Sequence, residues 1–120
     1  MPVSTERMPV STAEVIRGHL EAAREGVDAV MQHFTEESVL ITREATYRGL
    51  AEIRKFYTAF FNQIPKGFFD GFKLNRLETV GEIGYIHWQV DPWFLLATDT
   101  FVVRNGKILF QTFAVYPGSK

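Results

Sequence analysis

The segment Thr98–Tyr116 (TDTFVVRNGKILFQTFAVY) constrains the fold more than any other part of the sequence. Two runs rich in β-branched and aromatic residues are joined at Asn105-Gly106. A two-residue hairpin turn needs positive φ at both central positions, and Asn and Gly tolerate positive φ best. The sequence therefore predicts a β-hairpin, with Asp99 on its first strand. A carboxylate on an apolar strand is costly unless it is paired, hydrogen-bonded or protonated, so Asp99 is the first candidate functional residue.

The length and composition indicate a single domain with a genuine core. The chain has 120 residues, of which 46% are hydrophobic, as in an ordinary globular protein. Phenylalanine is unusually frequent, with 11 residues beside 4 Tyr and 2 Trp. These aromatic residues could fill a core, line a cavity or cover a dimer interface, and composition does not separate the three.

The charge and cysteine content exclude several classes of function. The net charge is −1, from 13 basic and 14 acidic residues without a run of like charge, so we expect no nucleic-acid partner. The absence of cysteine excludes disulfides and thiolate sites and suits a cytoplasmic protein, which is the location we predict. No apolar run reaches membrane-spanning length, and the N-terminus lacks a signal-peptide layout.

The first half of the chain reads as helices followed by two short strands. MPVST occurs at Met1–Thr5 and again at Met8–Thr12, and we expect residues 1–10 to be a flexible extension of a single domain over residues 11–120. A capping box at Ser11–Glu14 begins a helix that runs to about Glu25. The apolar spacing then predicts a short helix from Val27, strands at Ser38–Thr42 and Thr46–Arg48, and a helix over residues 50–64.

The second half changes to a period of two residues. This alternation predicts strands at Phe72–Val80, Ile83–Asp91, Leu96–Arg104 and Lys107–Tyr116. Helices followed by strands indicate an α+β fold with a mostly antiparallel sheet and helices on one face. Because Lys107–Tyr116 carries apolar residues on both faces, the outer face also needs a cover, and we expect a homodimer through it.

Several segments together resemble the NTF2-like superfamily, which includes SnoaL-like polyketide cyclases and ketosteroid isomerases. The segments are HLEAAREGVDAVMQHF, TEESVLI, YRGLAEIRKFYTAFF and TDTFVVRNGKILFQTF, within residues 13–116. The resemblance implies a cone, in which a curved, mostly antiparallel sheet is wrapped by three N-terminal helices around a deep apolar pocket. It is specific for the fold and weak for the activity.

The resemblance can be carried over to single positions. The oxyanion-binding acid of the isomerase-type members falls on Asp99, which matches. Their oxyanion-binding tyrosine falls on His19. Their catalytic carboxylate falls on Thr42, which cannot act as a base, and Glu44 could replace it only if its loop bends inward. Steroid isomerase activity is therefore not expected.

The candidate catalytic residues are Asp99, His19 and His87, and each has a structural alternative. Asp99 could be a pocket acid or a buried carboxylate satisfied by its neighbours. His19 could act as acid, base or donor, or be a boundary histidine. His87, Gln89 and Asp91 share one strand face. The resemblance favours the pocket side for that face, although a solvated face beside a buried Trp88 is the alternative.

The remaining candidates are substrate-binding residues, which we expect to line the pocket. They are Thr42, Tyr57, Phe60, Gln89, Asp91, Phe101, Gln111 and Phe113. Because the three histidines lie on different elements without ligand spacing, we expect neither a metal nor another cofactor. So many aromatic candidates favour a flat apolar ligand.

Three functions fit these features. The first is a cofactor-free isomerase, dehydratase or cyclase that transfers protons on an apolar carbonyl compound, with Asp99 and His19 polarising the oxygen and with His87, Asp91 or Glu44 as the base. The second is a non-catalytic binder of a hydrophobic metabolite, which the missing first-strand carboxylate favours. The third is a dimerisation module, which the apolar outer face of the sheet favours.

Overall fold

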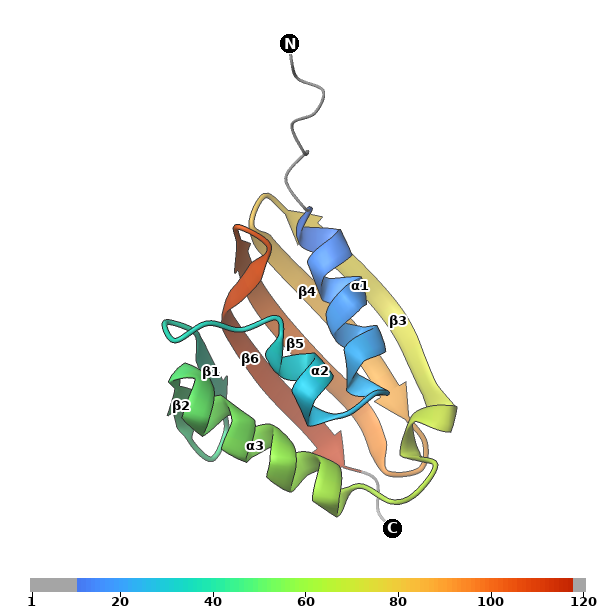
Figure 1. Cartoon of the computed structure of the whole chain (residues 1–120). Helices are drawn as coiled ribbons and strands as arrows, with labels where there is room; N and C mark the ends of the chain where they lie inside the picture. The colour runs from blue at the N-terminus through green and yellow to red at the C-terminus, as the bar shows by residue number, and fades with distance from the viewer. Residues whose placement is uncertain (1–10, 118–120) are drawn as a thin grey trace.

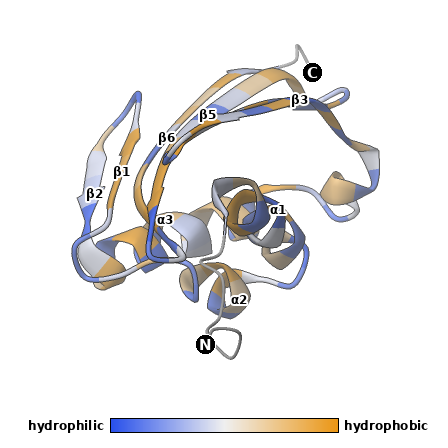
Figure 2. Cartoon of the chain, turned by 90° about the horizontal axis from the view of Figure 1, so that it is seen from above, coloured by the Kyte–Doolittle hydropathy of each residue, from blue (hydrophilic) through white to orange (hydrophobic). Residues whose placement is uncertain are grey.

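One curved six-stranded sheet, with three helices on its concave side, makes up the structure (Figures 1 and 2). This computed structural model describes residues 11–117. The strand order is β2-β1-β6-β5-β4-β3, and every pair is antiparallel except β1 with β6. The predicted α+β architecture with a mostly antiparallel sheet is confirmed. The extension predicted at residues 1–10 lies outside the described residues.

The helices and short strands begin and end close to where the sequence places them. The capping box is confirmed, because Ser11 Oγ accepts from the Glu14 N–H at 3.0 Å and Glu14 Oε1 accepts from the Ser11 N–H at 2.9 Å. The elements of this half are α1 (Thr12–Ala23), α2 (Val27–Met31), β1 (Val39–Thr42), β2 (Thr46–Arg48) and α3 (Gly49–Gln63).

The four long strands also follow the predicted order, and a short 3₁₀ helix precedes them. The elements are η1 (Phe68–Gly71), β3 (Phe72–Val80), β4 (Ile83–Val90), β5 (Phe94–Arg104) and β6 (Lys107–Pro117). At the predicted hairpin turn, Asn105 and Gly106 have φ of 54° and 76°. The sequence did not indicate η1, because a single 3₁₀ turn has no hydrophobic period to detect.

A β-bulge explains one departure from simple alternation. In a regular strand, Ile108 and Phe110 would share a face. The pairing between β5 and β6 shifts between Val102 and Val103, and Ile108 is fully buried whereas Phe110 is 44% exposed. An extra residue in one strand re-aims the side chains beyond it. The bulge therefore adds Ile108 to the core and leaves Phe110 on the outer face.

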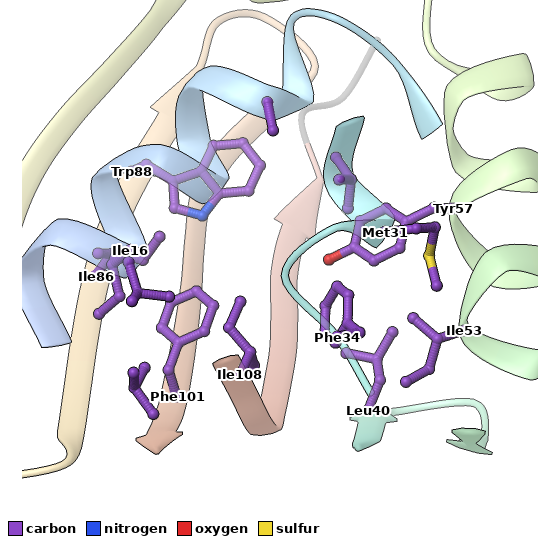
Figure 3. Close-up of a cluster of buried hydrophobic side chains, with 14 of the residues drawn as sticks. Ile16, Met31, Phe34, Leu40, Ile53, Tyr57, Ile86, Trp88, Phe101 and Ile108 are labelled. Carbon is purple, nitrogen blue, oxygen red and sulfur yellow. The ribbon is translucent and has the colours of Figure 1, made fainter. Parts of the chain in front are cut away.

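The core lies between the concave face of the sheet and the helices. Figure 3 shows Trp88 of β4 and Tyr57 of α3 entering it from opposite sides, with the Tyr57 hydroxyl directed away from its helix. Ile16, Leu40, Ile53 and other aliphatic side chains fill the space around these rings. None of the helices in the described residues is both long enough and apolar enough to cross a membrane.

Gly84 lets α1 approach β4 closely, which gives a first prediction. A Cβ added at Gly84 would overlap the side chain of Ile16, which is fully buried. We expect Gly84→Ala to lower the free energy of unfolding by about 1–3 kcal/mol, the usual cost of overpacking. Urea denaturation measures this loss. Adding Ile16→Val, which removes the overlapped methyl group, should recover part of the lost free energy of unfolding. If the losses of the two single variants simply add in the double variant, this packing is contradicted.

Candidate functional site

A cavity of about 60 Å³ lies between the helices and the concave face of the sheet. Helices α1 and α3, the turn η1 and strands β3 to β6 contribute its walls, which are mainly aromatic. The phenylalanines among them are Phe56, Phe60, Phe61, Phe69, Phe72 and Phe113. We call this space the aromatic cavity. Its walls suit an apolar, ring-containing ligand because aromatic faces offer large contact areas at a small cost in side-chain entropy.

Asp99 is the only carboxylate among the described residues that line the aromatic cavity. It is 5% exposed, and each of its oxygens accepts one hydrogen bond. Trp88 Nε1 donates to Oδ1 at 2.8 Å, and Gln111 Nε2 donates to Oδ2 at 2.8 Å. Both contacts are short, as expected for bonds to a charged acceptor.

Strand register brings these two donors to Asp99. Asp99 on β5 is paired with Ile86 on β4 and with Phe113 on β6. Trp88 and Gln111 each lie two residues away from these partners along their own strands, on the same face. Diagonal neighbours of this kind are within reach of long side chains. The carboxylate is therefore held between two neighbouring strands.

A further pair of contacts extends from Gln111 to the helices. The Tyr57 hydroxyl of α3 donates to Gln111 Oε1 at 3.1 Å. The same hydroxyl lies 3.4 Å from His19 Nε2 on α1. These contacts connect five buried side chains in a continuous series, which we call the relay. Its members, in order, are His19, Tyr57, Gln111, Asp99 and Trp88. It connects two helices to the three strands β4, β5 and β6.

Burial determines the protonation of the relay. Desolvation raises the pKa of Asp99 to about 6, although the hydrogen bonds from Trp88 and Gln111 act in the opposite direction. Desolvation, with a smaller effect from His33, lowers the pKa of His19 to about 3. Burial, with the charge of Asp99, raises the pKa of Tyr57. At neutral pH the site therefore holds a carboxylate, a neutral imidazole and a protonated phenol.

Six of the predicted site residues border the aromatic cavity. Asp99 and His19 lie there among the predicted catalytic residues, and Tyr57, Phe60, Gln111 and Phe113 lie there among the predicted substrate-binding residues. Phe101 is fully buried and its ring centroid is 5.7 Å from that of His19, behind the cavity wall. Phe101 supports His19 rather than contacting the cavity.

The prediction that His87, Gln89 and Asp91 face the pocket is wrong. Ile86 and Trp88 line the aromatic cavity, so the alternation of β4 puts His87 and Gln89 on the outer face. Gln89 Nε2 donates to both Asp91 oxygens at 3.2 Å, and Asp91 is exposed beyond the end of the strand. None of the three can reach a ligand in the cavity.

Thr42 and Glu44 also lie away from the aromatic cavity. Thr42 Oγ1 accepts from the N–H groups of Glu44 and Ala45, both at 3.2 Å, and so closes the turn between β1 and β2. The Glu44 side chain is 74% exposed. The predictions that Thr42 binds substrate and that Glu44 could serve as the base are therefore wrong, because the loop does not bend inward.

Trp88 and Arg24 are site residues that sequence reasoning missed. A buried indole N–H needs a hydrogen-bond acceptor, and Asp99, a carboxylate on an apolar strand, needs hydrogen-bond donors. The pairing of Trp88 with Asp99 could therefore have been predicted from the sequence. Arg24 is exposed at the end of α1 and forms part of the cavity rim. No signal in the sequence distinguished it from other surface arginines.

The described residues contain no cluster of three His, Cys, Asp or Glu side chains that could hold a metal ion. The chemistry considered for the aromatic cavity is therefore that of its own side chains. Asp99 is the lining group with a pKa nearest neutrality, which is the property expected of a general acid or base.

Comparison with known proteins gives a consistent assignment of the fold. The family model described as the SnoaL-like domain matches residues 16–110. A SnoaL-like protein of unknown function from Burkholderia thailandensis is similar with a TM-score of 0.72 and 14% identity, over 88% of this chain and 94% of that chain. Comparison with curated proteins found no match.

Two further solved structures are similar and carry functional names. A candidate polyketide cyclase from Sinorhizobium meliloti has a TM-score of 0.70 and 14% identity, over 83% of this chain and 93% of that chain. A candidate ketosteroid isomerase from Kribbella flavida has a TM-score of 0.67 and 13% identity, over 95% and 85%. At these identities the likeness shows the fold alone.

The shifted pKa values predict how stability depends on pH. Folding raises the pKa of Asp99 from 3.8 to about 6, so its stabilising contribution is complete below pH 3.8 and is lost as pH rises through 6. Folding lowers the pKa of His19 from 6.5 to about 3, so its contribution is present above pH 6.5 and is lost as pH falls toward 3. The two effects offset each other between about pH 4 and 6.

Asp99→Asn removes only the first effect. Acidification from pH 6.5 to 4 should therefore destabilise this variant more steeply than the wild type, by roughly 2 kcal/mol at 1.36 kcal/mol per pKa unit. Urea denaturation across this pH range measures the difference. Asp91→Asn, a change at an exposed acid, is the matched control. Parallel curves for Asp99→Asn and the wild type would contradict the prediction.

Proposed function

The chain belongs to the SnoaL-like family, within the NTF2-like superfamily, and from this premise we propose that it is a cofactor-free enzyme that moves a proton on a small apolar carbonyl compound. Asp99 is the group that carries the proton. The reaction class is isomerisation, dehydration or cyclisation. The names of the similar cyclase and isomerase structures are compatible with this class.

One observation carries the proposal: among the residues that the structure describes, Asp99, with a pKa of about 6, is the carboxylate that borders a cavity with aromatic walls. A base is most effective when its pKa lies near the working pH. An ordinary exposed aspartate is too weak a base for this task, whereas Asp99 is strengthened by burial. Its two donors, Trp88 and Gln111, carry no charge that would reverse this effect.

The proton transfer can be written with the residues of the cavity. An Asp99 oxygen removes a proton from the carbon next to the substrate carbonyl, and the electron pair of that C–H bond moves to the carbonyl oxygen. The C=O bond then re-forms as the protonated Asp99 returns the proton to the same carbon, or to the γ-carbon where the substrate has a β,γ double bond, and the carboxylate is restored. Tyr57, whose raised pKa preserves its O–H group, donates that hydrogen to Gln111 Oε1, and Gln111 in turn donates to Asp99, so Tyr57 helps to hold the base in place.

Proton exchange tests this proposal without knowledge of the natural substrate. We expect the wild type to accelerate exchange of the α-protons of small aromatic ketones in D₂O, followed by NMR. Asp99→Asn should lower this acceleration about 10²-fold or more, because the base is lost. His87→Gln and Glu44→Gln, which alter groups outside the cavity, should leave it unchanged. Equal acceleration of exchange by the wild type and by Asp99→Asn would contradict the proposal.

Non-catalytic binding is the second candidate. The observation that favours it is that Asp99 already accepts two hydrogen bonds and is the only carboxylate among the described lining residues. A binder would hold an aromatic compound without α-proton exchange. Binding of a small aromatic ketone, measured by Trp fluorescence, together with absent exchange would favour this function over catalysis.

We also propose that the chain forms a homodimer through the outer face of the sheet. Register aligns one apolar side chain from each of five strands in a row across this face. The row consists of Val39, Phe110, Val102, Ile83 and Val80. Phe110, Ile83 and Val80 are 44%, 52% and 69% exposed. A continuous apolar row that meets a copy of itself would bury these side chains.

Substitution of the central residue of the row tests the dimer. Phe110→Lys should raise the dimer Kd by roughly 30-fold, which corresponds to about 2 kcal/mol for an interface hot spot. Sedimentation velocity at micromolar concentrations measures the change. Glu37→Lys, at an exposed loop position, is the control and should remain dimeric. A monomeric wild type at these concentrations would exclude the proposal.

A further inference from the structure

His19 has a buried nitrogen that the fold leaves without a hydrogen bond. The side chain is 5% exposed, and its Nδ1 has no partner within residues 11–117. Its other nitrogen, Nε2, lies 3.4 Å from the Tyr57 hydroxyl. No side chain in this part of the chain therefore fixes the protonation of His19 from the Nδ1 side. The contact at Nε2 is the one that can decide which nitrogen carries the proton.

The relay settles the position of that proton when Asp99 is ionised. A carboxylate only accepts, so Gln111 must present its NH₂ group to Asp99 and its Oε1 to Tyr57. Tyr57 then uses its single hydrogen for Gln111, at 3.1 Å. The Tyr57 oxygen can only accept from His19, so the Nε2 atom of His19 carries the proton. In this state Nδ1 is a bare acceptor.

The order of donors reverses when Asp99 is protonated. The indole of Trp88 only donates, and it occupies Oδ1. The proton of Asp99 therefore lies on Oδ2 and faces Gln111, which must turn its amide to present Oε1. Gln111 then donates to the Tyr57 oxygen, and the Tyr57 hydrogen points to His19 Nε2. A neutral His19 must now carry its proton on Nδ1, after exchange with solvent or ligand.

We propose that the ionisation of Asp99 determines, through Gln111 and Tyr57, which nitrogen of His19 is protonated. With Asp99 ionised, the proton is on Nε2 and Nδ1 is an acceptor. With Asp99 protonated, the proton is on Nδ1 and Nε2 is an acceptor. Gln111 and Tyr57 are positioning residues in this scheme. The inference shares Asp99 with the proposed function, and it is carried by the hydrogen-bond geometry of the relay.

The titratable groups around the relay leave Asp99 as the group that changes near neutral pH. His33, after α2, lies edge-on to His19 at a ring-centroid distance of 5.9 Å, and burial lowers its pKa. His19 on α1 stays neutral because its pKa is about 3. Tyr57 on α3 stays protonated. Arg24 is at the exposed rim, and the nearest side chains from β4 and β6, Trp88 and Gln111, do not titrate.

The test is direct observation of the His19 tautomer by NMR of the protein labelled with ¹⁵N-histidine. Long-range ¹H–¹⁵N correlations distinguish the two neutral tautomers from each other and from the cation. His33→Gln and His87→Gln assign the His19 signals. In the wild type we expect mainly the Nε2–H form at pH 8 and mainly the Nδ1–H form at pH 5, with a midpoint near the Asp99 pKa of about 6.

Two substitutions separate the relay from a general effect of pH. Asp99→Asn should show the Nδ1–H form at both pH values, because its amide can donate to Gln111 while its oxygen accepts from Trp88. Tyr57→Phe should abolish the pH-dependent switch, since it removes the hydroxyl between Gln111 and His19. Thr112→Ala, on the outer face of β6, is the control and should retain the switch.

The wild-type titration decides the inference even if a variant fails to fold. A single His19 tautomer from pH 5 to pH 8 would overturn it, as would a switch that persists in folded Tyr57→Phe. The measurement involves neither turnover nor ligand. A protein without proton-exchange activity could therefore still show the tautomer switch, and an active protein could lack it. The experiments thus distinguish failure of the proposed function from failure of the proposed switch.

Discussion

The burial of the Asp99 carboxylate is the constraint on which the site depends. A charged group without donors could not remain in an aromatic interior, and the sheet supplies one donor from each neighbouring strand, Trp88 from β4 and Gln111 from β6. Both donors are in reach only because β5 is central and its two pairings are in register. The Asn105-Gly106 turn sets one of these registers, so the hairpin and the carboxylate belong to one arrangement.

The secondary structure could be predicted from the sequence because its signals are local. The Ser11–Glu14 capping box, the Asn-Gly turn and the change from a helical period to a period of two each act within a few residues. Short-range rules do not cover a bulge or a single 3₁₀ turn. This is why the re-aimed Ile108 and the segment Phe68–Gly71 were visible only in the structure.

The site was only partly predictable, because it depends on which face of each strand meets the helices. In β4 the polar residues His87 and Gln89 alternate with Ile86 and Trp88. Polarity left both faces possible, and the family resemblance favoured the polar set as a pocket wall. The apolar set, Ile86 and Trp88, faces the cavity instead, because the walls of the cavity are mainly apolar. The few polar groups there are hydrogen-bonded to one another. The useful clue was the indole of Trp88, which combines a large apolar body with one donor that a buried carboxylate can use.

The choice of neutral donors for Asp99 has a chemical consequence. An arginine or lysine at the same place would hold the carboxylate equally well, but it would lower the pKa and remove the basicity that burial creates. The ion pairs within residues 11–117 all have exposed members, and none includes Asp99. Trp88 and Gln111 fix the position of the carboxylate while its pKa remains about 6. Because neither donor carries a charge, Asp99 is ionised above that pH without a cation bonded to it, which leaves it able to accept a proton.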